Sequence, residues 1–575
     1  MSVTSMKRTL RDALKRAGAL PYIDLAREYL TASGRRQVRE DRRVVDDLRR
    51  AFRNAPPISR PHAQQPVFLI YGAHGPMAVI AKLPIVLAAQ ALGYRAWVLL
   101  PQLNPLIRLA YRLCRVRDFL YLGDYLSQEP HPLAENLHRS LKTADDLKQV
   151  TYKNCRIGMF CLSTLMRWNR MGDPDIRDPA TNAKLRGQLN LALQSADAAE
   201  AIANKLQPKI VLMNERGYSP YGELFDKVLA QGGECITWNA GHRNDMLVVK
   251  RYRPYNTAAH PLSLSAASWE RIKRMPWSDA HWRAVRDEIV GSYQSGEWYS
   301  ECATQLDKSQ VDRDEIVRRL DLDPARKTVG LFPHMFWDAT FFWGEDLFDN
   351  YEQWFVEVLK VAAKNTAVNW IVKIHPANVA KSIRDNFSGE FSEIAAIRRT
   401  IGKLPDHITL IPPDSDISTI SLFQIMDYCL TVRGTIGIEA GCFGIRVLTA
   451  GTGRFDRLGF TRDYATTADY LADLRRLPAL PPMTPAEIEL ARRFAYGVFM
   501  ARPTKLTANT FRFGDGILAQ LESKIRIEAP TIYSSPDVLS LAAWIASGDE
   551  DYMTPGFDAD AAHALAPAAQ KNLVG

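Results

Sequence analysis

The stretch NWIVKIHP, residues 369–376, decides the fold of this chain. Its apolar residues follow one another almost without interruption, which is typical of a strand buried on both faces of a parallel sheet. Because side chains alternate along a strand, Lys373 and His375 point to the same side, and Pro376 ends the strand and leaves His375 at its rim. A cation and an imidazole placed there can bind a phosphate oxygen. The alternative is a strand-end histidine that is bonded only to backbone.

The sequence on both sides of this strand continues as an α/β series. Further strand-like runs lie at residues 327–334, 408–413, 428–434 and 446–451, with stretches of helical spacing between them. Such an alternation predicts a doubly wound domain with a parallel sheet. Ligands of these sheets bind beyond the carboxyl ends of the strands, so the residues that follow each strand are the candidates for chemistry.

An earlier α/β series occupies the first half of the chain. Its strand-like runs are VFLIYGAHG (67–75), RAWVLLP (95–101), PKIVLMNE (208–215) and ECITWNAG (234–241). A chain of 575 residues exceeds the usual size of a single hydrophobic core. The predicted fold class is therefore α/β, with two Rossmann-like doubly wound domains that face a cleft and an N-terminal helical extension.

These patterns divide the chain into five predicted segments. They are a basic helical N-terminal extension (1–60), an N-terminal Rossmann-like domain (61–265), a helical connector (266–325), a C-terminal Rossmann-like domain (326–480), and C-terminal helices with a loose tail (481–575).

The formal net charge of +9 is concentrated near the N-terminus, because residues 1–60 contain 15 Lys and Arg against 7 Asp and Glu. This basic segment is either a solvated helical face or an arm that contacts the anionic lipids of the inner membrane. Nucleic acid is not expected as a partner, since acidic residues such as Asp41 and Asp46 interrupt the segment and no nucleic-acid-binding module follows it.

Other features of the composition predict a cytoplasmic protein. No apolar stretch is long enough to cross a bilayer, and the first residues lack the apolar region of a secretory signal. The seven cysteines show no CxxC spacing, which fits a reducing compartment and argues against a zinc site.

A second motif, RGTIGIEAG at residues 433–441, also reads as a strand, a tight turn and a helix. Arg433 supplies a cation, Gly434 allows a ligand to approach the backbone, and Thr435 adds a hydroxyl to the free N–H groups at the helix start. Glu439, one turn into the helix, can accept hydrogen bonds from ribose hydroxyls. The glycines do not form the GxGxxG pattern of dinucleotide-binding proteins.

The order of these motifs, KIHP, then PPDSDIS (412–418), then TxGxE, resembles the donor half of bacterial capsular polysaccharide glycosyltransferases, with the capsule Kdo transferases most similar. The His-Pro element is shared with CDP-glycerol glycerophosphotransferases and some bacterial sialyltransferases. The resemblance implies a GT-B fold, a donor that is usually a cytidine nucleotide, phosphate contacts from His375 and Thr435, and a ribose contact from Glu439. Many members carry Ser-Ser or Thr-Ser where Arg433-Gly434-Thr435 stands here, which leaves the base and sugar of the donor open.

GT-B enzymes usually place the acceptor and the catalytic carboxylate on the N-terminal domain. Glu215 follows a predicted strand and is a candidate general base or nucleophile, with a salt bridge to Arg216 or a neighbour as the alternative. His74 lies in the glycine-flanked turn after the first strand, and a capping or core histidine is its alternative. His242 and Arg243 form a third polar site after a strand.

Asp338 belongs to an aromatic segment, FWDATFFW, that follows the strand at residues 327–334. Asp338 is a candidate for binding sugar hydroxyls, and the rings near it suit the apolar face of a sugar. The same segment also reads as a loop that docks on the other domain or lies on a membrane surface.

Neither a metal nor a cofactor is expected. Asp414 and Asp416 match a DxD pattern in letters but lie in a Pro-rich loop, and the GxSxG, HExxH and Walker A patterns are absent from the sequence. The sequence thus predicts a metal-independent glycosyltransferase that moves a sugar from a nucleotide donor to a surface glycan or glycolipid. The alternatives are a polyol-phosphate transferase, a UDP-sugar epimerase, or an inactive scaffold of capsule assembly.

Overall fold

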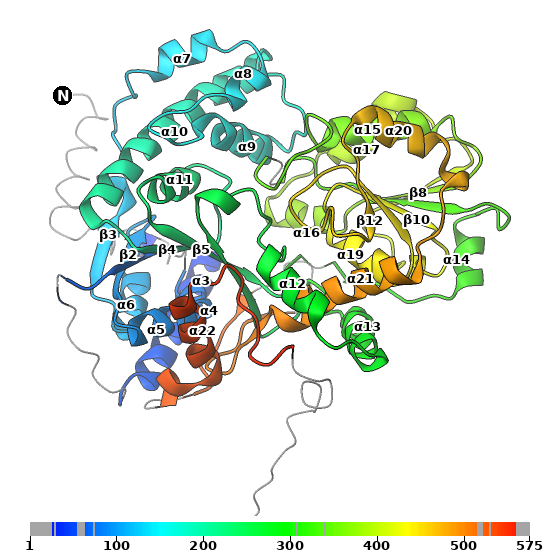
Figure 1. The fold of residues 1–575 in the computed structure, drawn as a ribbon. Helices are drawn as coiled ribbons and strands as arrows, with labels where there is room; N and C mark the ends of the chain where they lie inside the picture. Colours follow the sequence, from blue (N-terminus) through cyan, green and yellow to red (C-terminus); the bar gives the residue numbers. More distant parts are fainter. Residues whose placement is uncertain are drawn as a thin grey trace, which may run out of the picture.

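In the computed structural model the chain forms two α/β domains side by side (Figure 1). The structure describes residues 23, 26–27, 30–54, 62, 64–72, 75–302, 304–305, 307–338, 341–514, 521–527 and 531–558. His74 and the last residues of the predicted loose tail therefore lie outside the described residues.

The first domain is built on a seven-stranded sheet with the order β13-β6-β5-β4-β1-β2-β3. Strands β1 to β5 are parallel, and β6 runs antiparallel to β5. The strand bounds are β1 Val67–Tyr71, β2 Arg95–Leu100, β3 Asp118–Tyr121, β4 Ile210–Met213, β5 Glu234–Ala240, β6 Met246–Tyr252 and β13 Thr504–Lys505.

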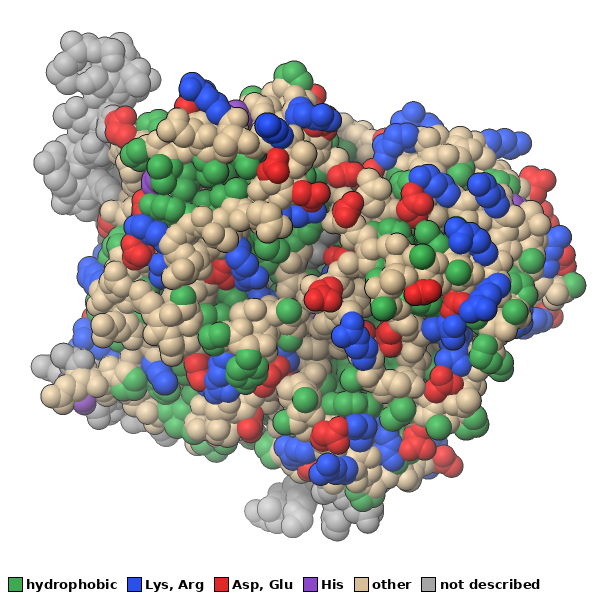
Figure 2. All heavy atoms as spheres, turned by 45° about the horizontal axis from the view of Figure 1, so that its top comes forward, with side chains coloured by type: hydrophobic (Ala, Val, Ile, Leu, Met, Phe, Trp, Pro, Cys, Tyr) green, Lys and Arg blue, Asp and Glu red, His purple; other side chains and the backbone are tan. Residues whose placement is uncertain are grey.

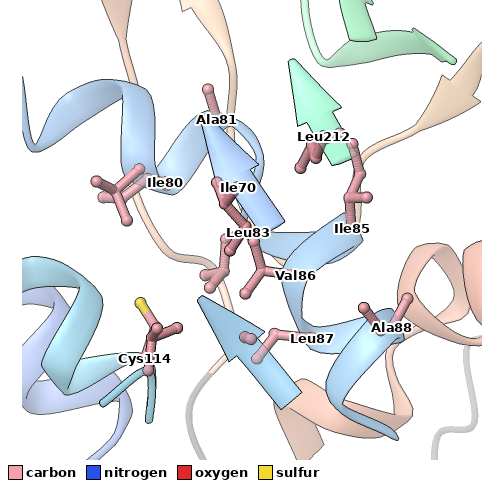
Figure 3. Packing of buried hydrophobic residues seen from close by; sticks show 14 of the residues in the cluster. Ile70, Ile80, Ala81, Leu83, Ile85, Val86, Leu87, Ala88, Cys114 and Leu212 are labelled. Carbon is pink, nitrogen blue, oxygen red and sulfur yellow. The ribbon is translucent and has the colours of Figure 1, made fainter. Parts of the chain in front are cut away.

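The core of this domain lies between the sheet and a layer of helices, among them α5 (Leu83–Ala91). Ile70 of β1 and Leu212 of the neighbouring strand β4 belong to this core, and Figure 3 shows Ile70 near Leu83 and Val86 of α5 and Leu212 near Ile85. These side chains are apolar because β1 and β4 are inner strands, which are covered on both faces.

The second domain is built on a six-stranded parallel sheet with the order β12-β11-β10-β7-β8-β9. The strand bounds are β7 Thr328–Leu331, β8 Asn369–Lys373, β9 Ile408–Ile411, β10 Tyr428–Thr431, β11 Arg446–Thr449 and β12 Thr461–Arg462. Read in chain order this is 3-2-1-4-5-6, the order of doubly wound nucleotide-binding folds, and β1 to β6 of the first domain follow it too. The predicted fold class is confirmed.

Helices cover the sheets and connect the two domains (Figure 1). The bounds of the remaining helices are α3 Ala32–Ala51, α4 Met77–Ala81, α6 Pro105–Leu113, α7 Ala134–Ser140, α8 Ala144–Lys148, α9 Ile157–Asn169, α10 Pro179–Leu206, α11 Gly222–Ala230, α12 Ala266–Arg274, α13 Asp279–Gln294, α14 Arg313–Arg319, α15 Tyr351–Ala362, α16 Ala377–Arg384, α17 Ser392–Ile401, α18 Thr419–Leu422, α19 Thr435–Cys442, α20 Thr467–Arg475, α21 Pro485–Ala495 and α22 Pro536–Ser547.

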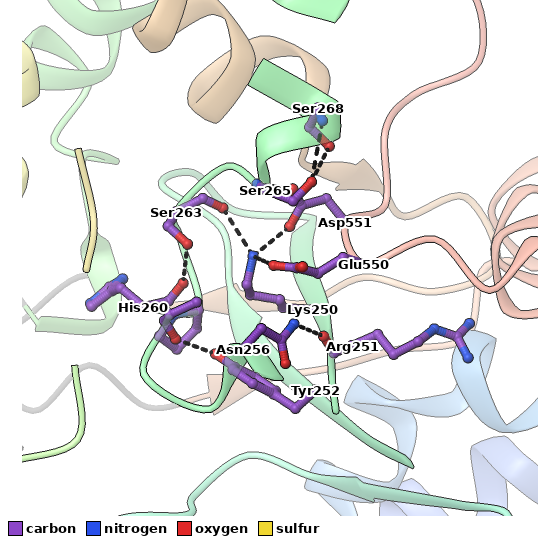
Figure 4. Close-up of polar contacts among 12 residues, drawn as sticks. Lys250, Arg251, Tyr252, Asn256, His260, Ser263, Ser265, Ser268, Glu550 and Asp551 are labelled. Atoms are coloured by element: carbon purple, nitrogen blue, oxygen red, sulfur yellow. Dashed lines mark hydrogen bonds and ion pairs between the residues drawn. The ribbon is translucent and has the colours of Figure 1, made fainter. Parts of the chain in front are cut away.

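After α21 the chain returns to the first domain. There β13 pairs with β6, and α22 packs against α5. A buried ionic network holds this return in place: the Lys250 ammonium of β6 lies 2.7 Å from both the Glu550 and the Asp551 carboxylates, and Lys250 and Asp551 are fully buried (Figure 4). Removing one partner of such a pair would leave the other as an uncompensated buried charge, so the network fixes the C-terminal segment on the first domain.

Two further properties bear on the sequence predictions. Among the described residues, no helix is long and apolar enough to cross a membrane. On the face drawn in Figure 2, Lys and Arg are interspersed with Asp and Glu. The five predicted segment boundaries stay a prediction, but the return of the chain after α21 was not expected.

Candidate active site

A pocket of about 460 Å³ lies between the two domains. The second domain lines it with the residues that follow β7, β8, β10 and β11, and the first domain contributes Asn239 and His260. The segment between them adds Tyr293 and Tyr299. In the second sheet, β7 and β10 are neighbours at the point where the strand order reverses, which is where doubly wound sheets bind ligands.

His375 lies at the end of β8 and lines this pocket. Its Nδ1 accepts a hydrogen bond of 3.2 Å from the Ala377 backbone N–H, at the start of α16. Burial, together with the nearby Lys381 cation, lowers the pKa of His375 to about 4. The ring is therefore neutral near pH 7, and because Nδ1 is an acceptor, the proton is on Nε2. His375 thus has one N–H donor to offer a ligand.

Lys373 is buried two residues earlier on the same strand. Its Nζ donates to the Ile417 carbonyl at 3.4 Å. Burial, with a contribution from the Lys308 cation, lowers the pKa of Lys373 to about 7. An anion in the pocket would favour the charged form of Lys373, since an opposite charge offsets the cost of burying an ammonium.

The turn between β10 and α19 forms another wall of the pocket. α19 has Gly434 as its N-cap, and no side-chain hydrogen bond caps this helix. A Cβ added at Gly434 would lie 2.8 Å from Thr431 Oγ1, so the turn has no room for a larger residue. The backbone N–H groups of Thr435 and Ile436 are thus at an uncapped helix start that faces the pocket, and such a start attracts anions.

Arg433 lines the pocket, but its guanidinium is already bonded within the second domain. It forms an ion pair with Asp346 and donates to the Tyr351 hydroxyl at 2.9 Å and to the Thr452 carbonyl at 3.1 Å. Its backbone N–H donates to His334 Nε2 at 3.2 Å. Arg433 therefore holds the turn in shape, and its predicted contact with the donor stays a prediction.

Arg454 is a pocket residue that the sequence analysis missed. Its guanidinium donates to the Arg433 carbonyl at 3.1 Å and to the Thr435 hydroxyl at 2.8 Å. Arg454 is only 8% exposed, and its buried Nε–H has no hydrogen-bond partner. The signal was present in the sequence, because Gly451-Thr452-Gly453-Arg454 follows β11 as small residues and then a cation at the end of a strand.

Two further histidines, His334 and His260, line the pocket. Burial lowers the pKa of His334 to about 3 and that of His260 well below its usual value, and the cations of Arg433 and Arg454 lower both further. Since a positive potential disfavours protonation, these shifts indicate a site suited to an anion.

Glu439 is the carboxylate of this part of the pocket. Its Oε2 accepts a hydrogen bond of 2.5 Å from the Tyr293 hydroxyl. Burial raises the pKa of Glu439 to about 7. Glu439 remains a candidate for a ribose contact because it lines the pocket one turn inside α19.

A second charged cluster lies where α9, the loop after β4 and the second domain meet. Asp338 accepts hydrogen bonds from Lys381 Nζ at 2.6 Å and from the Tyr218 hydroxyl at 3.1 Å, and the Arg167 guanidinium lies 3.8 Å away. The Lys381 and Arg167 cations hold the pKa of Asp338 well below its usual value. Asp338 is thus ionised and lines the pocket.

Glu215 is the second carboxylate of this cluster, and its pKa is shifted in the opposite direction to that of Asp338. Among the described residues its side chain has no hydrogen bond or ion pair, so it does not form the salt bridge with Arg216 that was its alternative role. Burial raises the pKa of Glu215 to about 7, and the nearby Asp338 charge adds to that effect against the opposing Arg167 cation. A carboxylate with this pKa is suited to accept a proton near neutral pH.

The aromatic segment that contains Asp338 docks on the first domain. The ring of Phe342 stacks on that of Phe160 in α9 at 5.4 Å, and the Arg216 guanidinium lies 4.2 Å from the Trp343 ring. These contacts agree with domain docking, one of the three interpretations of the segment. Phe342 is thus used in packing between the domains, whereas Trp343 both packs on Arg216 and lines the pocket.

The remaining candidate residues from the sequence are not among those that line the pocket. His242 Nε2 and the Glu288 carboxylate of α13 are 2.8 Å apart, and Arg243 pairs with Glu288 and Glu297, so this polar site joins β5 to the connector. Asp416 pairs with Arg319. In the described part of the chain, no group of three or more His, Cys, Asp or Glu is arranged to hold a metal ion.

Comparisons with known proteins found only distant similarities. No protein-family model matches the chain, and no curated protein matches it. The beta Kdo 2,4 transferase KpsC of Thermosulfurimonas dismutans is 14% identical, with a TM-score of 0.29 over 51% of this chain and 80% of that one. The UDP-GlcNAc 2-epimerase of Neisseria meningitidis, bound to UDP-GlcNAc, is 11% identical, with a TM-score of 0.26 over 76% of this chain and 97% of that one. Anabaena HepE in complex with UDP is 11% identical, with a TM-score of 0.23 over 84% and 99%.

Proposed function

We propose that this protein is a glycosyltransferase of GT-B type, which transfers a sugar from a nucleotide-activated donor to a glycan or glycolipid acceptor. The observation that carries the proposal is the convergence of unused donors on one pocket between two Rossmann-like domains. These donors are the neutral imidazole of His375, the buried guanidinium of Arg454 and the uncapped start of α19.

On the donor side, the leaving group is a nucleotide phosphate. Negative charge builds on it as the bond to the sugar breaks, and preorganised donors aimed at that charge lower the barrier. His375 Nε2–H, the Arg454 guanidinium and the N–H groups of Thr435 and Ile436 take this role. Lys373, whose pKa is about 7, gains a proton as the phosphate arrives and adds a full charge.

On the acceptor side, Glu215 is the general base. With a pKa of about 7 it is both ionised in a large fraction of molecules and basic enough to accept the proton of an acceptor hydroxyl. Asp338, kept ionised by Lys381 and Arg167, takes the role of binding hydroxyls of the donor sugar. The role proposed for His74 stays a prediction, because His74 lies outside the described residues.

The sequence motifs suggest a donor class and a biological setting for this proposal. The resemblance of KIHP and TxGxE to capsule Kdo transferases favours a cytidine monophosphate sugar and an acceptor in surface polysaccharide synthesis. Glu439 lies in the pocket where a ribose contact is expected.

The test is a thermal-shift titration with CMP, CDP, UDP and GDP. A ligand at about 100 times its Kd adds about 2.7 kcal/mol of stability, which is a readily measured shift. One nucleotide should stabilise the wild-type protein and should lose that effect in His375→Ala, while a variant of the exposed His62, His62→Ala, should keep it. If none of the four nucleotides shifts the transition, the proposal fails.

A further inference from the structure

α3 has two opposite faces. The apolar residues Val38, Val44, Val45 and Leu48 are buried against the first domain. The solvent face carries a series of exposed arginines, Arg35, Arg36, Arg39, Arg42, Arg43, Arg49 and Arg50, and Arg53 follows at the end of the helix. All basic residues of this helix are arginine and none is lysine.

α6 packs against α3 and extends this basic surface. Its buried side contains Ile107 and Tyr111, which belong to the same hydrophobic core as Val44 and Leu48 of α3. Arg108 and Arg112 are exposed on its other side, with Arg117 just beyond the helix. Together the exposed arginines of α3 and α6, with Arg53 and Arg117, form what is called here the arginine surface.

Only part of this charge is neutralised within the protein. Arg49 pairs with Asp46, and Arg50 pairs with Asp47. The side chains of Arg36, Arg39 and Arg43 have no ion pair or hydrogen bond with any residue that the structure describes. The whole chain has a formal net charge of only +9, so this surface carries a large share of the excess.

We propose that the arginine surface binds the anionic headgroups of a phospholipid membrane. The planar guanidinium donates two parallel hydrogen bonds to a phosphate, so a surface built from arginine alone favours phosphate over a general anion. Leu30, which precedes α3, is 78% exposed and adds an apolar side chain next to the basic stripe. Such a combination of basic residues and an apolar side chain is typical of proteins that adsorb to anionic membranes.

A nucleic acid would need other features of the surface. Proteins that bind single strands without sequence preference add aromatic rings on which bases stack. α3 itself contains no aromatic residue, and Phe52, which follows it, is 4% exposed. The half-buried Phe119 ring already lies beside the Arg108 and Arg112 guanidiniums, 5.4 and 6.0 Å from its centroid. The surface therefore fits closely spaced phosphates in a plane better than a base-bearing polymer.

The experiment is sedimentation of the full-length protein with lipid vesicles. One set contains equal parts of phosphatidylglycerol and phosphatidylcholine, and the other contains phosphatidylcholine alone. The wild type should bind only the first set, and binding should weaken in about 1 M salt, where the screening length falls to about 3 Å. The triple variant Arg36→Glu, Arg39→Glu, Arg43→Glu should bind about 100-fold more weakly.

The matched control reverses three exposed arginines elsewhere, Arg283→Glu, Arg313→Glu and Arg475→Glu, and so changes the net charge equally. The control should bind like the wild type, and both triple variants should keep the wild-type unfolding temperature. Equal binding by the two triple variants, equal binding to both vesicle sets, or tighter binding to poly(U) RNA than to the anionic vesicles would each overturn the proposal. The outcome is independent of nucleotide binding in the pocket.

Discussion

His375→Asn tests the electrostatics of the pocket through the pH dependence of stability. The asparagine keeps an acceptor for the Ala377 N–H but removes the group that titrates. In the folded protein the pKa of His375 is about 4, whereas an unfolded chain has a histidine pKa of about 6.5. Between these values the unfolded state binds more protons than the folded state, so the free energy of unfolding rises with pH there and is flat above about 6.5.

The magnitude follows from the same two values. Each pKa unit corresponds to about 1.4 kcal/mol, so on going from about pH 7.5 to about pH 5 the wild type should lose about 2 kcal/mol through His375 alone. His375→Asn should lack this loss. Other histidines titrate in both proteins, so their contributions cancel in the comparison.

The assay is urea unfolding at both pH values, monitored by tryptophan fluorescence. The transition to analyse is the one whose midpoint shifts when nucleotide is bound. His62→Asn, a change at an exposed histidine, serves as the matched control and should behave like the wild type. If wild type and His375→Asn lose the same stability to within about 0.5 kcal/mol, His375 titrates as a solvated histidine and the account of the pocket is wrong.

Three further predictions concern the carboxylate, the unexpected arginine and the C-terminal return. Glu215→Gln should lower the transfer rate by about 10²–10⁴-fold and abolish the rise in rate with pH through about 7; an unchanged pH profile would exclude Glu215 as the base. Arg454→Lys should weaken nucleotide binding by about 10–100-fold in calorimetry, since it loses a charged hydrogen bond. Arg457→Lys, at an exposed position nearby, should leave the affinity unchanged. Equal affinities of Arg454→Lys and the wild type would exclude Arg454 from the phosphate site. Asp551→Asn should destabilise the first domain by about 3 kcal/mol in urea unfolding because Lys250 loses a buried partner, and a change below about 1 kcal/mol would show that the C-terminal segment is not held by this network.

The sequence predicted the structure best in the inner strands, where the apolar pattern of a segment also indicates its place in the sheet. Apolar runs bounded by polar turns located most of the inner parallel strands, among them β1, β8 and β10. Their carboxyl ends necessarily meet at one edge of each sheet. Lys373, His375, Thr435 and Glu439 therefore line one pocket, as expected from their positions after strands.

The edge strands β3, β12 and β13 escaped prediction for a physical reason, whereas the edge strand β9 was predicted at residues 408–413. β12 and β13 have two residues each, which is too few for a periodic pattern, and only one of the four residues of β3 is buried, so β3 lacks the continuous apolar run of an inner strand. β13 exists because the chain returns to β6, and β6 itself runs antiparallel beside β5. Pairing of this kind depends on which segments meet in space, not on local propensity.

The sequence by itself determined the class of fold and the edge of each sheet at which the candidate residues gather, because both follow from the order and polarity of strands. Only the tertiary structure decided which cations remain available to a ligand. Arg433 and Arg454 both follow a strand. Arg433 is paired with Asp346, whereas Arg454 keeps a buried N–H that has no hydrogen-bond partner. The same holds for Glu215 and Asp338, whose pKa values are set in opposite directions by burial and by the positions of Lys381 and Arg167. Whether a cation is free to bind a ligand, and which pKa a carboxylate has, depend on neighbours that come from distant segments of the chain. The sequence pattern does not contain the distances to those neighbours.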